Sequence, residues 1–305
     1  MIEKIIVASS LEEATEIANK YKGTFNVVAI EAEWGDLALE EPYVDLSINH
    51  HGARANNPCP AEIGLERDVN HHNENNVYIL SHLDADTLFG IMWVEGMLSK
   101  NNTETRSLCE IIAFSDKKGY HKAKDKYRDI KNTNLGRKWL TLGYLFSRNT
   151  KVSPGDVTDK VRLILEAAVK IIEHDSVKDL TIYKEASKWS SKKQKNVLEA
   201  LDYEGDKILG FVGKLFYCDN YSLLDKTREF IVQYDTQLQT ILFSSIDEAT
   251  AKKYFGEKGV VSVLQEYFGD EAGGHVAIGG SPRNKKLPQK EYVDFIKFVE
   301  TKIKG

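Results

Sequence analysis

The sequence is poor in features that mark several classes of protein. Only three cysteines occur among 305 residues, and none forms a CxxC pair: Cys59, Cys109 and Cys218. This excludes a disulfide framework and a structural zinc site and favours a reducing, cytoplasmic compartment. No apolar run approaches the roughly eighteen residues of a membrane span, and the apolar stretch in "MIEKIIVASS" is too short for a signal peptide. We therefore expect no membrane partner.

An excess of positive charge is also missing. The formal net charge is -5 and the pI is about 6.0, which argues against a grip on nucleic acid by the whole surface but leaves room for a local basic groove. The acidic balance favours a short anionic substrate over a long nucleic acid. The chain is 42% hydrophobic and 10% aromatic, so its 305 residues are sufficient for a full core and about two domains.

Strand and helix patterns alternate through the first half of the chain. Apolar runs predict five strands, at residues 4–9, 25–32, 43–49, 76–81 and 110–116. Amphipathic helical patterns lie at residues 11–21 and 85–100. This alternation predicts an α/β domain over residues 1–150, with a largely parallel five-stranded sheet covered on both faces.

The second half changes character twice. Residues 151–205 show long helical periodicity and are predicted to form a helical connector. Residues 206–305 return to mixed structure, with strands expected at 208–218, 229–235 and 239–245 and helices at 259–269 and 290–303. We expect a second, smaller α/β domain there. No internal repeat is visible.

A metal-binding pattern follows one buried strand. In "NVYILSHLDADTLFG", residues 76–90, the apolar run is succeeded by His82, Asp84 and Asp86. The carboxyl ends of parallel strands meet at one edge of a sheet, where ligands bind. Imidazole and carboxylate ligands suit an ion such as Mn²⁺, and two ions need a bridging carboxylate. The alternative is that Asp86 is a helix N-cap and Asp84 a turn residue.

Two further predicted strand ends strengthen the metal hypothesis. "EIIAFSD" ends on Asp116, and "YVDLSIN" is followed by His50 and His51. Taken alone, Asp116 is more typical of a turn. Three strands that deliver Asp or His to one edge nevertheless predict a shared cluster, because adjacent histidines before a glycine are not explained by turn chemistry.

A glycine-rich segment near the C-terminus suggests an anion contact. In "FGDEAGGHVAIGGSPRNKK", residues 268–286, two Gly pairs flank His275 and Arg283 follows. Glycines let the backbone present its N–H groups to a phosphate, and Arg binds phosphate oxygens in a forked manner. We expect Gly273, Gly274, His275 and Arg283 to bind substrate. The simpler alternative is a helix-to-strand connection.

Together, "SHLDADTLFG", "INHHG", "IIAFSD" and "GGHVAIGG" resemble motifs of the DHH phosphoesterase superfamily with its DHH-associated C-terminal domain. The resemblance implies two Mn²⁺ or Mg²⁺ ions. His82 and Asp84 would hold one ion, Asp86 the other, and Asp116 would bridge both. His50 would ligate metal, and His51 and Asp116 would be catalytic. Residues 206–305 would be the associated substrate-binding domain, in which the GGH loop receives the distal end of the substrate.

The chain departs from the family pattern at two points. Asn49 stands where the signature has its Asp, and the His pair precedes the HxDxD segment instead of following it. Asp156 and Asp159 are candidates for the last metal-binding acid of the family. A rearranged sheet can build the same cluster, because parallel strands converge on one edge whatever their order in the sequence.

The resemblance implies a metal-dependent hydrolase that cleaves a phosphoester or phosphodiester. Its expected substrate is a nucleotide or a short single-stranded nucleic acid. The alternative is a non-catalytic nucleotide-binding or regulatory protein with a degenerate metal site. A factor related to aminoacyl-tRNA synthetases ranks last, because no synthetase motif is visible. The sequence specifies neither the oligomeric state nor the polarity of any exonuclease action.

Overall fold

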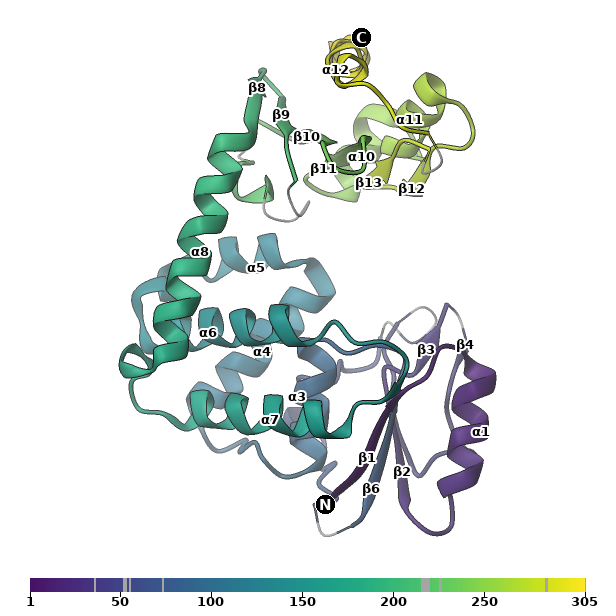
Figure 1. Ribbon diagram of the computed structural model, residues 1–305, viewed down its shortest axis with the longest axis vertical. Coiled ribbons are helices and arrows are strands. Elements are labelled where there is room, and N and C mark those ends of the chain that lie inside the picture. Colours follow the sequence, from purple (N-terminus) through teal and green to yellow (C-terminus); the bar gives the residue numbers. More distant parts are fainter. Residues whose placement is uncertain are drawn as a thin grey trace. The chain divides into compact units, whose positions relative to one another are not determined.

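Figure 1 shows a computed structural model of the chain, which describes residues 1–35, 37–51, 54, 56–72, 74–214, 220–224, 227–282 and 285–304. The chain divides into two compact units, Met1–Trp189 and Ser190–Gly305, and each unit is described by itself. Within the described ranges, no helix is both long and apolar enough to cross a bilayer.

The first unit is built on a five-stranded sheet of order β5-β2-β6-β1-β7. Its strands are β1 (Ile2–Val7), β2 (Asn26–Ile30), β5 (Leu46–Ile48), β6 (Asn76–Leu80) and β7 (Gly155–Asp156). A small hairpin consists of β3 (Glu33–Trp34) and β4 (Leu37–Ala38). The helices are α1 (Leu11–Tyr21), α2 (Ile63–Glu66), α3 (Ala85–Val94), α4 (Thr103–Lys118), α5 (Tyr120–Lys126), η2 (Arg128–Asn132), α6 (Asn134–Asn149), α7 (Thr158–Glu173) and η3 (Val177–Asp179).

The expected α/β class is confirmed, with one strand misplaced. The strands β5, β2, β6 and β1 are parallel, and β7 runs antiparallel at the edge. The prediction of a strand at residues 110–116 is wrong, because these residues lie inside α4. A short apolar run fits a buried helix as well as a strand. Buried Leu108, Ile111 and Ile112 recur at helical spacing, and Asn102 caps the helix through Thr105 N.

Both faces of this sheet are buried, as the parallel arrangement requires. Val28 and Ile30 of β2 pack into a core with the helices α3, α4, α6 and α7. Val27 and Ala29 of the same strand point the other way and pack on α1 through residues such as Ala14. In Figure 1, α1 accordingly lies on one side of the sheet and α3 and α7 on the other. The ends of the strands remain as the surface for ligands.

The second unit contains a six-stranded sheet of order β12-β13-β11-β10-β9-β8. Among its described strands, β9 and β10 are parallel neighbours and the other neighbouring pairs are antiparallel. The strands are β8 (Leu201–Glu204), β9 (Ile208–Val212), β10 (Phe230–Asp235), β11 (Thr240–Ser245), β12 (Gly273–His275) and β13 (Ile278–Gly280). The helices are η4 (Tyr221–Leu223), α10 (Glu248–Phe255), α11 (Val260–Phe268) and α12 (Gln289–Lys304).

Alternation along β10 and β11 separates two cores in this unit. Phe230 and Val232 pack with Phe243 of β11 and with α10, α11 and α12. Ile231 points to the opposite face and packs against the end of the long helix α8 (Thr181–Ala200), at Val197. The helical segment predicted for residues 151–205 therefore consists mainly of α7, whose Val161 and Leu165 belong to the first core, and α8.

Candidate metal centre

Three neighbouring strands end at the same level of the first sheet. In the register, Ile30 of β2 pairs with Ile48 of β5, and Ala29 pairs with Ile79 of β6. The backbone continues this alignment by one step, since Glu31 N donates to Ile48 O at 3.0 Å and Ser81 N donates to Glu31 O at 3.3 Å. The residues that follow these strands are consequently gathered at one edge, as the sequence led us to expect.

Glu31 lies at the centre of this edge and is fully buried. Its Oε1 lies 2.8 Å from His50 Nε2 and 2.9 Å from His51 Nε2. Its Oε2 accepts a hydrogen bond from Thr87 Oγ1 at 3.1 Å and lies 3.5 Å from His82 Nε2. One carboxylate thus faces three imidazoles that come from two other strand ends.

The backbone of Glu31 is unusual as well. Its φ of 47° lies in the left-handed region, which residues other than Gly, Asn and Asp seldom adopt. Such strain persists where the surroundings hold it, and it is concentrated at functional sites. Glu31 was missed in the sequence analysis, although a signal was present: an acid directly after "NVVAI" satisfies the same strand-end rule that selected His82.

His82, Asp84 and Asp86 of the predicted HxDxD segment lie close to Glu31, His50, His51 and Asp116, and we call these seven residues together the centre. The three HxDxD residues have different local roles. Asp84 is the N-cap of α3 and forms a capping box with Thr87, whose backbone N donates to Asp84 Oδ1 at 2.9 Å. The other oxygen, Asp84 Oδ2, lies 3.6 Å from His82 Nε2. The N-cap role considered for Asp86 therefore belongs to Asp84, and the same carboxylate also faces an imidazole.

Asp86 lies in the first turn of α3 and is 1% exposed. Its Oδ1 accepts a hydrogen bond from Ala61 N at 2.9 Å. Its Oδ2 is buried and has no hydrogen-bond partner among the described residues, although His50 Nε2 lies 3.3 Å away. A buried carboxylate oxygen without a partner is costly, which makes this atom a strong candidate for a metal ligand.

Asp116 reaches the centre from a helix and not from a strand end. It lies near the C-terminus of α4, and its Oδ2 is 3.5 Å from His50 Nε2. The reason given for this residue in the sequence analysis was therefore wrong, because no strand ends there. Proximity to His50 is nevertheless observed.

Two polar residues fix the turn that carries the adjacent histidines. The carboxylate of Glu33 accepts hydrogen bonds from His50 N at 3.4 Å and from His51 N at 3.2 Å. Buried Asn49 accepts from Ala32 N at 3.1 Å and donates to Leu39 O at 3.1 Å. The side chain of Asn49, which stands at the signature Asp position, thus forms hydrogen bonds with the backbone on either side of the β3–β4 hairpin.

The electrostatics of the centre follow from carboxylates that face imidazoles at short distance. Burial acts to lower the pKa of His50, but the carboxylates of Asp86 and Glu31 outweigh it and raise that pKa to about 10. Asp84 raises the pKa of His82 to about 9 against the effect of burial. Burial raises the pKa of Asp86. Burial also acts to raise the pKa of Glu31, but its histidine neighbours outweigh this and lower it. The cluster therefore demands compensating positive charge.

The donor atoms fall into two groups of the kind that holds a metal ion. Glu31, His50, His51 and Asp116 form one group whose ligand atoms lie within 4.8 Å of one another, and Glu31, His82 and Asp84 form a second such group. Glu31 is common to both groups, and the unpartnered Oδ2 of Asp86 lies beside His50. Mixed imidazole and carboxylate donors are suited to Mn²⁺, and carboxylates to Mg²⁺.

The two other acids considered as metal ligands have different surroundings. Asp156 Oδ2 accepts a hydrogen bond from Lys4 Nζ at 2.7 Å, and Asp156 Oδ1 accepts from Thr158 N at 3.0 Å. The side chain of Asp159 is 99% exposed and lies 4.0 Å from Arg162. Both carboxylates serve the start of α7, where negative charge near a helix N-terminus is favourable.

The glycine-rich segment forms a hairpin at the edge of the second sheet. Gly274 has a φ of 152°, and a Cβ there would clash with Gly279 Cα and Ile278 O. The pairing of β12 with β13 thus requires glycine. Gly273, Gly274 and His275 are all exposed. Arg283 lies outside the described residues. Substrate binding by this segment stays a prediction.

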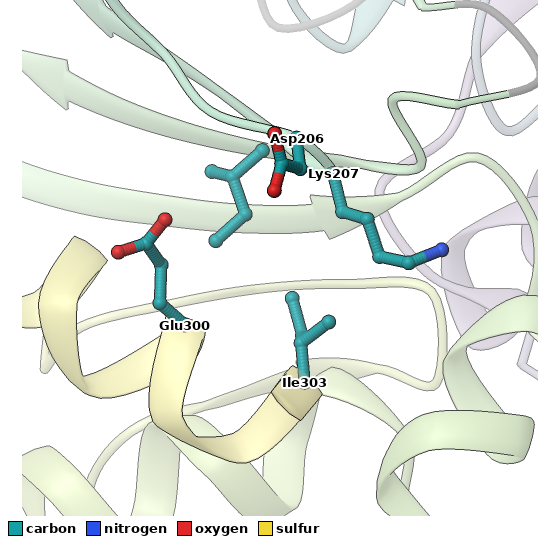
Figure 2. Close-up of a pocket in the computed structure, with 5 residues that line it drawn as sticks. Asp206, Lys207, Glu300 and Ile303 are labelled. Atoms are coloured by element: carbon teal, nitrogen blue, oxygen red, sulfur yellow. The ribbon is translucent and has the colours of Figure 1, made fainter. Parts of the chain in front are cut away.

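A small pocket of about 120 Å³ lies elsewhere in the second unit, between the start of β9 and α12 (Figure 2). Two of its charged residues have protein partners: Lys207 Nζ donates to Glu229 at 2.7 Å, and Glu300 accepts from Tyr203 OH at 2.6 Å. These contacts connect strands and helix within the unit.

No protein-family model and no curated protein matches this chain. Among solved structures, it is similar to a pGpG-specific phosphodiesterase, PggH, from Vibrio cholerae, at 13% identity over 67% of this chain and 75% of the other, with a TM-score of 0.38. It is also similar to the DHH domain of a member of a family of ribosomal proteins, at 16% identity over 98% and 69%, with a TM-score of 0.41.

A third similar structure is an exopolyphosphatase-related protein from Bacteroides fragilis, at 11% identity over 98% of this chain and 72% of the other, with a TM-score of 0.30. One of these three structures is described as a DHH domain. The identities and TM-scores are low, so the chemistry of this chain has to be judged from its own geometry.

Proposed function

We propose that the chain is a metal-dependent phosphoesterase of the DHH type, which hydrolyses a phosphoester or phosphodiester in a nucleotide or a short oligonucleotide. The observation that supports this most strongly is the position of Glu31, which is shared by two groups of metal-ligating side chains. A buried carboxylate between two imidazole and carboxylate groups is the arrangement expected of a bridging ligand.

In this proposal, His82 and Asp84 would hold one cation, and His50, Asp86 and Asp116 would hold another. Glu31, and not Asp116 as predicted from the sequence, would be the carboxylate common to both groups of ligands. Cations held there supply Lewis-acid chemistry, because they lower the pKa of water and neutralise charge on phosphoryl oxygens. Thr87 and Glu33 orient the ligands through their hydrogen bonds to Glu31 and to the backbone at His51.

His51 is the residue best placed to touch the substrate. Its ring packs against His50 with centroids 4.2 Å apart, and its side chain is 46% exposed, while the side chain of His50 is 3% exposed. A half-exposed imidazole at the rim can donate a hydrogen bond to a phosphoryl or leaving-group oxygen. We propose this role for His51. Gly273, Gly274, His275 and Arg283 are proposed to select the substrate.

A panel of substrates tests the proposal. The protein is purified, loaded with Mn²⁺ or Mg²⁺, and assayed for hydrolysis of dinucleotides, cyclic dinucleotides, single-stranded oligonucleotides, pyrophosphate and polyphosphate. We expect two ions per chain and turnover of at least one nucleotide substrate. Nucleotide binding by a chain that holds no metal and hydrolyses nothing would contradict the proposal and indicate a non-catalytic binding protein.

A further inference from the structure

We propose that a basic and aromatic surface next to Asp116 binds the bases and phosphates of a single-stranded oligonucleotide whose scissile phosphate lies at the metal centre. We call it the α5 surface and define it by Lys118, Tyr120, Lys124, Lys126 and Arg128, all of which are exposed. This inference rests on the proposed function, since it names the class of substrate and predicts a chain of several nucleotides.

The first observation is the local charge. Residues 117–137 contain eight Lys and Arg and only two Asp, in a chain whose net charge is -5. A run of charge is often no more than a hydrated surface. Here the local net charge is positive although that of the whole chain is negative, and the run follows directly on a proposed metal ligand, Asp116. Positive residues close to a reaction centre attract polyanions and guide them to it.

The second observation is a row of aromatic rings beneath these charges. Tyr120 packs edge-on against Trp139 with centroids 5.5 Å apart, and Trp139 lies 6.4 Å from Tyr127. Tyr127 in turn packs against Phe114 of α4 at 5.9 Å. The ring of Trp139 supports Tyr120 on one side, while 38% of Tyr120 stays exposed. A rigid, partly exposed ring among cations is a platform on which a nucleobase stacks.

Lysines accompany the aromatic row at both ends. Lys124 Nζ lies 5.3 Å from the centre of the Tyr120 ring, and Lys126 Nζ lies 4.1 Å from that of Phe114. Their charges are thus held on the rings through cation–π contacts. A strand that stacks a base on Tyr120 would meet ammonium groups beside that base, which is the combination found in single-strand binding surfaces.

The third observation is the continuity with the metal centre. Lys117 and Lys118 directly follow Asp116 in α4, and Gly119, with a φ of 89°, ends that helix before Tyr120 begins α5. Because Tyr120 follows Asp116 by four positions, their Cα atoms lie within about 14 Å of each other. A bound strand needs only a few nucleotides to reach from the platform to the ligands.

The aromatic row decides between two kinds of polyanion. Inorganic polyphosphate would bind through the lysines alone, because it has no group that stacks on an exposed ring. A single-stranded oligonucleotide uses both features, because its phosphates contact the cations and its unstacked bases contact the ring of Tyr120. The structure therefore favours the oligonucleotide, and polyphosphate becomes an outcome of the test.

Binding is measured apart from hydrolysis, by fluorescence anisotropy of a labelled eight-nucleotide single strand with the full-length protein in EDTA. The double variant Lys118→Ala, Lys124→Ala should bind at least about tenfold more weakly and lower the salt dependence by about 1.4 in the log–log slope. The control is Lys20→Ala, Lys100→Ala. Lys20 also lies 5.3 Å from a tyrosine ring, and Lys100 precedes the opposite end of α4. This control should change affinity less than about twofold.

A second pair of variants tests the platform. Tyr120→Ala should weaken binding at least about fivefold, while Tyr120→Phe, which keeps the ring, should bind as the wild type does. Equal loss in the lysine variant and its control would overturn the proposal, as would polyphosphate binding as tight as that of the oligonucleotide with no effect of Tyr120→Ala. Oligonucleotide binding that is weakened by the lysine variant and by Tyr120→Ala, in a protein that hydrolyses nothing, would instead contradict the proposed function. It would still support the α5 surface as a binding site for single strands.

Discussion

His50 Nε2 and Glu31 Oε1 lie 2.8 Å apart at the buried edge of the first sheet, although the two residues are separated by nineteen positions in the sequence. The contact exists because β5 and β2 run parallel in register and both end at this level. Glu31 also faces His51 and His82. The centre is therefore organised around one carboxylate, and its removal is the sharpest test of the proposed site.

Glu31→Gln keeps the size of the side chain and removes its charge. We expect loss of at least one bound cation per chain and a fall in kcat of at least about a hundredfold, because loss of an outer hydrogen-bond partner alone typically costs about 10- to 100-fold. Metal content and single-substrate kinetics measure this. Glu12→Gln, at an exposed position in the first turn of α1, is the matched control and should behave as the wild type.

Asp86→Asn tests the buried oxygen that has no hydrogen-bond partner among the described residues. The amide can keep the hydrogen bond from Ala61 N through its oxygen and removes a buried negative charge. In EDTA the variant should melt at a lower temperature than the wild type, because it loses the contact of Asp86 Oδ2 with His50 Nε2 at 3.3 Å. Added Mn²⁺ should raise its Tm much less than that of the wild type. Asp159→Asn, also in the first turn of a helix but exposed, is the control. A full Mn²⁺ response in Asp86→Asn would show that this carboxylate binds no metal.

Thr87 is expected to position Glu31 without touching the substrate. Thr87→Val removes the hydroxyl that donates to Glu31 Oε2 at 3.1 Å and keeps the shape of the side chain. We expect Mn²⁺ affinity to fall by about 10- to 100-fold. The variant also loses the hydrogen bond that Asp84 N donates to Thr87 Oγ1, which should cost about 1 kcal/mol of stability. Thr87→Ser retains the hydroxyl and should restore the Mn²⁺ affinity, as measured by calorimetric titration. Equal Mn²⁺ affinity in the two variants would assign Thr87 a purely structural role.

The pair of Asp156 and Lys4 predicts a pH dependence of stability away from the centre. Hydrogen bonds from Lys4 and Thr158 lower the pKa of Asp156 from its ordinary value of 3.8 to about 2. The depressed pKa stabilises the folded state above pH 3.8, and this contribution is lost as the pH falls toward 2. Asp156→Asn should thus lower the unfolding midpoint in urea at about pH 6 by a small amount, because solvent screens this exposed pair. The difference should shrink at acidic pH, and a gap independent of pH would contradict this account.

The exposed GGH hairpin predicts an effect on substrate binding. His275→Ala should raise KM for nucleotide substrates while leaving hydrolysis of a small generic phosphodiester unchanged, since the latter needs only the metal centre. Arg283→Ala should act in the same direction. Lys258→Ala, elsewhere in the second unit, serves as the control. Unchanged kinetics in both variants on a confirmed substrate would show that the hairpin is only structural.

Several features of the protein could be predicted from local sequence. The apolar runs at residues 26–30, 76–80 and 230–235 define strands because β-branched and aromatic residues are bounded by polar ones. The HxDxD segment indicated that His82, Asp84 and Asp86 lie together at one edge of the sheet, since they follow directly from a buried strand. These inferences hold because strand alternation and strand ends are properties of a few consecutive residues.

Other features depended on contacts between distant segments. The run around Ile111 has the composition of a strand, but its helical spacing of buried residues and its packing in the first core make it part of α4. Glu31 is one of several acids in "AIEAEWGD". Its place directly after a strand is a local signal, but its contacts with His50, His51 and His82 come from other segments of the chain.

The sequence by itself thus determined which residue types stand at the strand ends, because alternation and turn chemistry act over a few positions. Only the tertiary structure decided which of them share a site. Parallel pairing of β5, β2 and β6 places Glu31 among His50, His51 and His82, whereas Glu33 accepts hydrogen bonds from the backbone of His50 and His51. The choice follows from strand order and register, which are long-range properties that a single segment does not encode.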